Sequence, residues 1–432
     1  MAFMQKKLIG NAAIVILAFI PLALWVTTNP TSHLHEEMNN NLQRVGEYFA
    51  TTALVLFSCA IVLSTRAPFL EPFFGGLDKM YMTHKRTALT GFTCILLHFA
   101  IIPKDDFFTP GSYMGLAAML GMLVLIVLTL APRLPIPFLR WPLSLPYHQW
   151  KLTHKFVGVF FIMGLLHSFN VEHLTQESAP LDLYTRGMAG VAAVIYVYQA
   201  FLSGFVRRKH AYTVEAVNRL NGTVAEVVLK PNAAKLKHHA GQFLFIHFPT
   251  EKKLSEPHPF TISSAPKEDT VRLSIKTSGD FTGHLHETLQ PGTAARLEGP
   301  YGQLNYKHAG RKQIWVAGGI GVTPFLSWAR DFESGSRHEI YFYYSVRTKE
   351  DALFWEELEN AGKRFPFFKP KLFCSNTDGR LTVEKMAAGA GLLADVDVFM
   401  CGPLPMTMGL AQQFRAAGVP DSRLHFEEFN FR

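Results

Sequence analysis

Two stretches of sequence decide the fold: HKRTALTGFTCILLH at residues 84–98 and HKFVGVFFIMGLLH at residues 154–167. Each is a largely apolar segment that begins and ends with a histidine, at spacings of 14 and 13 residues. A polar imidazole at membrane depth costs free energy unless a partner such as a metal ion satisfies it. At ~1.5 Å rise per residue, each pair spans roughly 20 Å along its helix. This separation predicts two stacked haems that bridge the same two helices and form an electron path across a hydrocarbon layer ~30 Å thick.

The candidate metal ligands are therefore His84, His98, His154 and His167. A single histidine near a helix end is usually an interfacial or hydrogen-bonded residue. Two helices that each carry a pair at similar separation favour bis-histidine haem ligation instead. Thirteen residues miss the starting face of an ideal helix by ~140°. We therefore expect the second of these helices to tilt, tighten or be distorted, for instance at Gly158 or Gly164, or the haems to meet it from rotated directions.

The first half of the 432-residue chain is dominated by long apolar runs. Six segments are long and apolar enough to span a membrane, and they lie at residues 8–28, 47–65, 85–102, 112–131, 151–169 and 184–206. Thirteen Lys and Arg residues near these segments lie on the side of the termini, and three lie on the other side. The positive-inside rule then predicts a multi-pass inner (plasma) membrane protein whose termini and second half are cytoplasmic. No Asp or Glu lies in the middle of a predicted span, which argues against a cation-coupled permease.

The second half has the pattern of a two-domain α/β protein. Short alternating strands bounded by turn residues predict an antiparallel barrel, with strands at 212–217, 223–229, 243–248, 271–276 and 295–298. Strands that alternate with helical stretches then predict a parallel sheet, with strands at 314–317, 340–346, 367–373 and 396–400. The fold class is thus a multidomain membrane protein with a six-helix haem-binding bundle, a β-barrel and a Rossmann-like domain. The predicted domains are residues 1–208, 209–307 and 308–432.

Three motifs of the second half carry candidate chemistry. HPFTISS at 258–264 follows a strand and offers a hydroxyl and backbone amides to a planar ring. GGIGVTP at 318–324 lies between an apolar strand and a helix, where glycines let backbone N–H groups approach a phosphate. CGP at 401–403 follows another apolar strand, at the sheet edge where ligands gather in open α/β sheets.

Composition excludes several other classes of function. The net charge is +8, but the basic residues are scattered or flank apolar segments, so the chain has no nucleic-acid-binding stripe. The four cysteines include no CxxC pair and no disulfide-like spacing, which argues against a cysteine metal site or a disulfide framework.

Together these motifs resemble the NADPH oxidase and ferric reductase superfamily, in particular bacterial ferric reductase-like transmembrane flavocytochromes b. The resemblance implies that His84 with His154 holds an inner b-type haem, and His98 with His167 an outer one. It also implies an FAD domain of the ferredoxin-reductase type. The residues that would line the isoalloxazine are His258, Pro259, Phe260 and Thr261, with Thr261 near the reactive nitrogen and Ser263 and Ser264 nearby. The segment KTSGDFT resembles the pyrophosphate segment and implicates Lys276, Gly279 and Thr282.

The same resemblance assigns a nicotinamide nucleotide site to the last domain. Its residues would be Gly318, Gly319, Gly321, Val322, Thr323, Pro324, Cys401, Gly402 and Pro403. Arg347 falls where family members bind a 2′-phosphate, which favours NADPH over NADH. Phe431 would be the terminal aromatic residue that stacks on the flavin, although Arg432 follows it here. The residues expected at the reacting atoms are Thr261, Cys401 and Phe431.

The expected activity is transfer of a hydride from NADPH to FAD, followed by single-electron transfer through the inner and outer haems. Six-coordinate bis-histidine iron has no open position, so the last transfer is expected to be outer-sphere. Two outer acceptors compete: oxygen, which yields superoxide, and a ferric chelate. An alternative is a flavocytochrome that reduces a periplasmic protein partner. From a different class, an iron or haem permease would need transport groups that the spans lack. The oligomeric state stays open.

Overall fold

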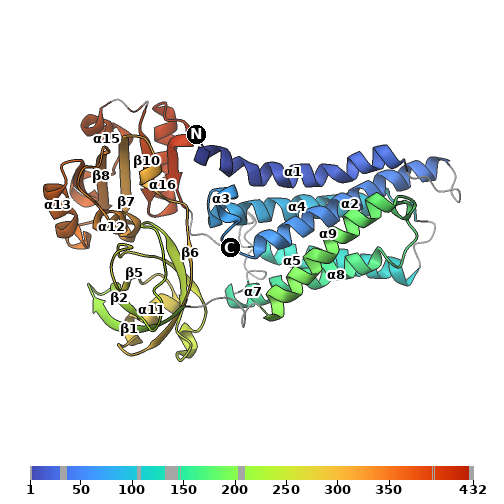
Figure 1. Ribbon diagram of the computed structural model, residues 1–432, viewed down its shortest axis with the longest axis horizontal. Helices are drawn as coiled ribbons and strands as arrows, with labels where there is room; N and C mark the ends of the chain where they lie inside the picture. Colours follow the sequence, from blue (N-terminus) through green and yellow to red (C-terminus); the bar gives the residue numbers. More distant parts are fainter. Residues whose placement is uncertain are drawn as a thin grey trace. The chain divides into compact units, whose positions relative to one another are not determined.

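The computed structural model describes residues 2–29, 37–104, 109–131, 145, 147–202, 210–391, 393 and 395–427. The chain divides into two compact units, which Figure 1 draws in sequence colours. The helical unit comprises Lys6–Phe74 and Lys79–Val206. The sheet unit comprises Arg207–Arg432 together with Met1–Gln5 and Gly75–Asp78.

The helical unit is built almost entirely of helices. They are α1 (Ala2–Thr28), α2 (Glu37–Ser64), α3 (Glu71–Phe74), α4 (Leu77–Ile101), α5 (Pro110–Leu130), α7 (Tyr147–Lys155), α8 (Val157–His167) and α9 (Ala179–Val197), with the 3₁₀ turn η2 (Leu174–Glu177) and the π-helical turn η3 (Tyr198–Leu202). Buried side chains from α2, α4, α5, α8 and α9 form one core. Small residues let these helices approach closely: a Cβ at Gly91 of α4 would lie 3.3 Å from the Leu56 Cβ of α2.

Many large apolar side chains of this unit point outward, as expected of helices in contact with lipid. Examples are Phe19 and Val26 on α1 and Val194 on α9, with 57%, 72% and 71% of their surface exposed. Within the described residues, three helices are long and apolar enough to cross a membrane, at Ile9–Thr28, Asn41–Ser64 and Pro110–Leu130.

Three of the six predicted spans therefore meet this criterion, and the spans predicted at 85–102, 151–169 and 184–206 do not. Charged residues explain the first exception, because α4 contains Asp78, Lys79, Lys85 and Arg86 within one helix. The second predicted span is divided between α7 and α8, of 9 and 11 residues. In the third, α9 carries an acidic and a basic residue in its first half.

The helix that carries the second histidine pair is interrupted at Phe156, between α7 and α8. The Phe156 N–H donates to the Thr153 carbonyl at 3.0 Å, which is the tighter i→i+3 pattern of a 3₁₀ turn. The expectation that this helix tightens or is distorted is confirmed. The predicted location of this distortion, at a glycine, is wrong. A Cβ at Gly158 would lie 2.1 Å from the Tyr196 ring, so this glycine serves the packing of one helix against another.

The barrel lobe of the sheet unit is a nearly closed antiparallel sheet. Its strands are β1 (His210–Arg219), β2 (Val224–Pro231), β3 (Phe243–His247), β4 (His258–Thr261), β5 (Val271–Lys276) and β6 (Ala294–Tyr301), in the order β4-β3-β6-β1-β2-β5. An isolated bridge between Ile262 and Leu273 joins the two ends. The turn η4 (Lys252–Leu254) precedes β4, and helix α11 (Asp280–Thr288) follows β5. All five predicted barrel strands are confirmed, and β4 is an additional short strand.

The nucleotide lobe is a parallel sheet covered on both faces. Its strands, in the order β11-β10-β7-β8-β9, are β7 (Lys312–Gly318), β8 (Glu339–Val346), β9 (Phe368–Cys374), β10 (Asp397–Cys401) and β11 (Leu424–Phe426). Its helices are α12 (Thr323–Arg330), α13 (Trp355–Arg364), α14 (Ser375–Asp378), α15 (Val383–Ala390) and α16 (Leu404–Ala416), with short turns η5 (Tyr306–His308), η6 (Gly319–Val322), η7 (Lys349–Asp351) and η8 (Asp421–Arg423). The four predicted strands are confirmed, and β11 was not predicted.

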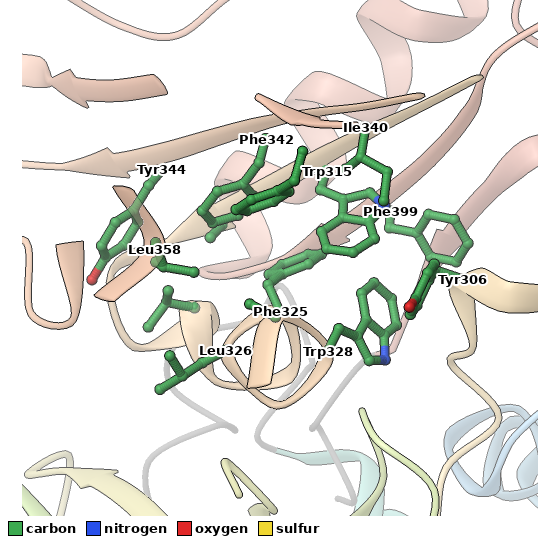
Figure 2. Close-up of a cluster of buried hydrophobic side chains, with 14 of the residues drawn as sticks. Tyr306, Trp315, Phe325, Leu326, Trp328, Ile340, Phe342, Tyr344, Leu358 and Phe399 are labelled. Carbon is green, nitrogen blue, oxygen red and sulfur yellow. The ribbon is translucent and has the colours of Figure 1, made fainter. Parts of the chain in front are cut away.

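Alternate residues of β7 enter two separate cores of this lobe. Trp315 packs with the side chains of α12 and α13, whereas Ile314 packs with those of α15 and α16. Figure 2 shows the first core, in which Phe325 and Trp328 of α12 lie beside Trp315. Helices cover both faces of this sheet. Ligands of such sheets bind outside the carboxyl ends of the strands, and the glycine-rich turns lie there.

Candidate functional site

Three of the four candidate ligand histidines are oriented by backbone carbonyl groups. The Nδ1 atoms of His84, His98 and His167 lie 2.7, 3.0 and 2.7 Å from the carbonyl oxygens of residues 60, 46 and 111. A carbonyl oxygen only accepts, so each Nδ1 carries the proton and donates it. The Nε2 lone pair is then the electron pair available to a metal. Second-shell acceptors of this kind fix the tautomer and the ring orientation of metal-bound histidine.

His154 is oriented by a hydroxyl group. Its Nδ1 lies 3.5 Å from Thr129 Oγ1, and the same oxygen accepts the Trp150 indole N–H at 3.1 Å. The single hydroxyl proton of Thr129 donates to the Leu125 carbonyl at 2.8 Å. The hydroxyl has no further proton to donate, so Nδ1 of His154 is again the donor. Among the described contacts of these four histidines, no hydrogen bond involves an Nε2 atom.

The spacing within the first pair fits a bound metal. The ring centroids of His84 and His154 are 6.3 Å apart. Two metal–nitrogen bonds of ~2 Å, with roughly 1 Å from each nitrogen to its ring centre, require ~6 Å. These residues therefore fit a haem iron held between α4 and α7. Among the described residues there is no group of three or more His, Cys, Asp or Glu side chains placed to hold a metal ion. A bis-histidine haem site needs only two such side chains.

The second pair lines a cavity of about 600 Å³ within the helical unit. His98 and His167 both contribute to its wall, together with apolar side chains such as Met119 and Phe161. Its polar lining includes Lys104 and Arg186. A cavity with two imidazoles in its wall, an apolar body and cationic side chains fits haem, which combines an apolar macrocycle with two carboxylates.

One acidic side chain of this cavity lies inside a candidate span. Glu47 belongs to α2 and is 4% exposed. Its carboxylate accepts the backbone N–H groups of Leu174 (2.9 Å) and Thr175 (3.2 Å), and the side-chain amide of Gln43 at 2.9 Å. These three donors satisfy the buried carboxylate and tie the turn η2 to α2, which gives Glu47 a structural role.

The HPFTISS motif forms β4 and the turn that follows it. Residues His258, Pro259, Phe260 and Thr261 are half-buried and pair with β3. The His258 ring stacks on Phe281 of α11, with centroids 3.8 Å apart. The motif thus presents a half-buried surface beside α11, where a planar ring could lie.

Ser263 and Ser264 have no exposed surface. The Ser263 hydroxyl donates to the Arg272 carbonyl at 3.0 Å, and the Ser264 hydroxyl accepts the Arg272 N–H at 3.1 Å. In this structure both hydroxyl groups therefore join the motif to β5.

The KTSGDFT segment forms the end of β5 and the first turn of α11. Lys276 is exposed, and a Cβ at Gly279 would meet no atom within 4 Å. The Thr282 hydroxyl accepts the N–H groups of Ser278 and Gly279 at 2.8 and 3.2 Å. An open glycine, an exposed lysine and a helix N-terminus are the elements of an anion site. Thr282 itself caps the helix.

The two glycine-bearing turns of the nucleotide lobe meet at the same sheet edge, as predicted. Strands β7 and β10 are parallel neighbours, with Ala317 opposite Cys401. A Cβ at Gly321 would lie 2.3 Å from the Cys401 carbonyl oxygen, and one at Gly402 would lie 3.0 Å from the Gly318 Cα. Only hydrogen fits at Gly321, and a side chain at Gly402 would crowd the backbone of Gly318. Gly319 adopts a φ of +53° and faces open space.

The remaining candidate residues of this lobe surround those turns. Val322, Thr323 and Pro324 are buried at the start of α12, where the Thr323 hydroxyl donates to the Ile320 carbonyl at 3.1 Å. Pro403 precedes α16. Arg347 is exposed immediately after β8, at the same edge. Phe431 lies outside the described residues.

Sequence reasoning missed Glu427, which follows the unpredicted strand β11. Its carboxylate accepts the Gln303 N–H at 2.9 Å and lies against Gly302, where the barrel lobe ends. Burial, and secondarily the charge of Glu427, raises the pKa of the Cys401 thiol to about 12, so the thiol is neutral at physiological pH. Strand β11 has only three residues, too few for a sequence pattern to have marked this position.

Comparison with known proteins places each part of the chain. Residues 49–165 match the family of the ferric reductase like transmembrane component. Residues 209–305 match an FAD-binding domain, and residues 315–412 match the oxidoreductase NAD-binding domain.

Among curated relatives, the glycine betaine monooxygenase reductase subunit of Chromohalobacter salexigens is 30% identical over 187 residues, which are 39% of this chain and 50% of that protein. A flavohemoprotein of Rhodopirellula baltica is 23% identical over 265 residues, 56% of this chain and 65% of that protein. The chain thus spans about half the length of the first of these relatives, and somewhat less than two thirds of the second.

Among solved structures, flavohemoglobin from Malassezia yamatoensis aligns with a TM-score of 0.50 and 17% identity, over 92% of this chain and 100% of that one. This likeness concerns the fold alone. A ferric reductase like membrane component followed by FAD-binding and NAD-binding domains is a specific domain order. The chain has the domain architecture of the NADPH oxidase and ferric reductase superfamily and is a flavin- and NAD(P)H-dependent oxidoreductase.

Proposed function

We propose that this protein transfers electrons from NADPH through FAD and two b-type haems to an acceptor on the outer face of the membrane, either oxygen or a ferric chelate. The observation that carries the proposal is the hydrogen-bonding pattern shared by four imidazoles in the helical unit. Each donates its Nδ1 proton to a protein oxygen and keeps the Nε2 lone pair for a metal. Three of these acceptors are backbone carbonyl groups, which accept only from a protonated Nδ1.

In this proposal His84 and His154 hold the inner haem, and His98 and His167 hold the outer one. When bound, FAD takes a two-electron hydride from NADPH, and the haems carry the electrons singly. The chain contributes ligation, orientation and exclusion of water. Lys104 and Arg186 of the outer cavity supply positive charge for the haem carboxylates.

In the sheet unit, residues 258–261 bind the isoalloxazine, and Ser263 and Ser264 support this strand from behind. The start of α11, with Lys276, Gly279 and Thr282, binds the pyrophosphate. The turns at 318–324 and 401–403 bind the nicotinamide nucleotide, with neutral Cys401 beside the reacting ring. Phe431 completes the flavin site.

The membrane topology completes the proposal. Helix α4, the α7–α8 pair and α9 cross the membrane together with the three apolar helices. The distribution of Lys and Arg places both termini and the sheet unit in the cytoplasm of an inner (plasma) membrane.

The test is an anaerobic spectrum of the purified full chain supplemented with FAD. NADPH should bleach the flavin and then produce the absorption bands of reduced six-coordinate haem. Rapid reoxidation by air, with superoxide formed, identifies an oxidase. Slow reoxidation by air with fast reoxidation by a ferric chelate identifies a ferric reductase. A protein without haem bands would refute the proposal.

Replacing Arg347 by serine should reduce kcat/KM for NADPH by about 10- to 100-fold, because a hydrogen bond to a charged group contributes ~1.5–3 kcal/mol. The value for NADH should not change, since NADH has no 2′-phosphate. Steady-state reduction of ferricyanide with each nucleotide measures both values. An equal loss for the two nucleotides would contradict the assignment of Arg347.

Replacing Gly115 by alanine should weaken binding of the outer haem by roughly tenfold, in the range found for second-shell changes at metal sites. The new Cβ would lie 2.8 Å from Nδ1 of His167 and would displace the ring from the Gly111 carbonyl. Haem content per chain and redox titration of the two haems provide the readout. The matched control is Gly187→Ala in α9, where a Cβ meets no atom within 4 Å. Equal haem loss in both variants would contradict the prediction.

A further inference from the structure

Helix α12 joins the two lobes of the sheet unit by direct hydrogen bonds. The last turn of this eight-residue helix donates three times to backbone carbonyl groups of the barrel lobe. These bonds run from Ser327 Oγ to the Ser264 carbonyl oxygen (2.8 Å), from Trp328 Nε1 to the Ala240 carbonyl oxygen (2.9 Å) and from Arg330 Nη1 to the Ser263 carbonyl oxygen (2.9 Å).

The acceptors lie together at one end of the β3–β4 pair, where Phe243 is opposite Thr261, next to the candidate flavin surface. Ser263 and Ser264 are the last residues of the HPFTISS motif, and Ala240 shortly precedes β3, the strand paired with β4. The opposite end of α12 follows directly from the glycine turn η6. One helix, ~12 Å long at 1.5 Å per residue, therefore begins at the nucleotide turn and ends on the flavin motif.

The junction is closely packed. Ser327 and Trp328 have no exposed surface, and Figure 2 shows Trp328 within the buried aromatic cluster of the nucleotide lobe. Gly241 has a φ of +90°, and a Cβ there would lie 2.3 Å from Trp328 Nε1. Its N–H also donates to Ser327 Oγ at 3.4 Å. The turn at 240–241 is thus shaped to admit the indole of α12.

Arg330 adds an electrostatic part to the junction. Its side chain is 8% exposed and binds Glu357 of α13 with two bonds, of 2.6 and 2.8 Å. Its Nη1 lies 3.6 Å from Glu226 Oε1 of β2. That buried oxygen accepts no hydrogen bond within the described structure, and the guanidinium of Arg272 lies 3.9 Å away. The charge of Arg330 therefore connects α13 of one lobe with β2 of the other.

We infer that Arg330 and Ser327 are positioning residues for hydride transfer, which hold the nucleotide turn at a fixed separation from the flavin motif. The inference rests on the first step of the proposed function, reduction of flavin by NADPH. Neither side chain needs to touch either cofactor. A rigid connection matters here because an error of ~1 Å in the approach of two reacting rings can reduce the rate ~100-fold.

The experiment uses the full chain with FAD bound, mixed with NADPH without oxygen in a stopped-flow instrument. The variants are Arg330→Gln, Arg330→Lys and Ser327→Ala. The matched control is Arg415→Ala, which removes an arginine whose ion pair with Asp421 lies within the nucleotide lobe. Four quantities are measured: the limiting rate of flavin bleaching, the NADPH concentration at half-saturation, the long-wavelength charge-transfer absorbance of the nicotinamide–flavin pair, and the unfolding temperature.

Arg330→Gln should reduce the limiting rate about tenfold and weaken the charge-transfer absorbance, with half-saturation unchanged. Arg330→Lys should lie between Arg330→Gln and the wild type, since it keeps the charge and one donor. Arg415→Ala should match the wild type. An unchanged limiting rate and absorbance in Arg330→Gln, with only the unfolding temperature lowered, would overturn the inference.

Ser327→Ala keeps the test decisive if Arg330→Gln loses FAD. It changes no charge, and an unchanged limiting rate in that variant would also overturn the inference. A wild-type chain that does not reduce its flavin would refute the proposed function itself, so the two failures are distinguishable.

Discussion

Replacing His98 or His167 by alanine is expected to remove one of the two haems and to abolish electron transfer across the membrane, while NADPH still reduces FAD at the normal rate. Each variant removes one of the two candidate ligand imidazoles in the wall of the outer cavity and leaves the inner pair intact. Haem content per chain, stopped-flow bleaching of the flavin and reduction of an external acceptor by sealed vesicles separate the three effects.

His173→Ala is the control for this experiment. His173 lines the same cavity, but its Nε2 already contacts the Arg186 guanidinium and lies 2.8 Å from the Ser168 carbonyl oxygen, so protein groups occupy the nitrogen that a metal would need. This variant should keep two haems. An alanine variant at His98 or His167 that retains both haems and full transfer would disprove the ligand assignment.

Replacing Gly321 by alanine should reduce kcat/KM for NADPH roughly 100-fold, because a small misplacement of the nucleotide turn is costly to hydride transfer. The added Cβ would lie 2.3 Å from the Cys401 oxygen and 2.5 Å from its carbon, and backbone atoms of a central strand cannot yield cheaply. We also expect a loss of ~1–3 kcal/mol in the free energy of unfolding. NADPH-dependent ferricyanide reduction and thermal unfolding measure the two effects.

Gly409→Ala is the matched control for that substitution. Gly409 lies within α16, and a Cβ there would meet no atom within 4 Å. Alanine at an unhindered helical position should stabilise the fold by ~0.5–1 kcal/mol and leave kcat/KM unchanged. Normal NADPH kinetics in Gly321→Ala would show that the two turns do not form the nucleotide site.

The sequence was sufficient for the four longer strands of the nucleotide lobe, β7 to β10, because turns and helical segments bound each of them. It was less informative where tertiary contacts decide the outcome. Strands β4 and β11 have only 4 and 3 residues, too few for a periodic signal. The interruption at Phe156 carries no glycine or proline that would mark it, and its position is set by how α7 and α8 pack.

In the candidate site, too, the sequence predicts some residues, and the folded structure alone reveals the others. Spacing alone selected the four histidines, since ligand type and depth are encoded locally. The groups that orient the histidines are not encoded locally. The carbonyl that accepts from His167 belongs to Gly111, 56 residues away. A backbone carbonyl has no residue-type signature, so no pattern could reveal it. Likewise, Ser327 and Ser264 are 63 residues apart in the sequence, and their contact forms only when the two lobes are folded together.

The hydrogen-bonded tautomer of the four histidines has an electrical consequence. An imidazole that donates through Nδ1 and ligates through Nε2 is neutral. In the proposed function an electron passes outward between the two sites, and their neutral ligands supply no proton or cation to accompany it, so the transfer is electrogenic. An interior-negative potential then favours each electron by ~2.3 kcal/mol for every ~100 mV crossed. The voltage across the membrane, as well as the supply of reduced nucleotide, becomes part of the driving force.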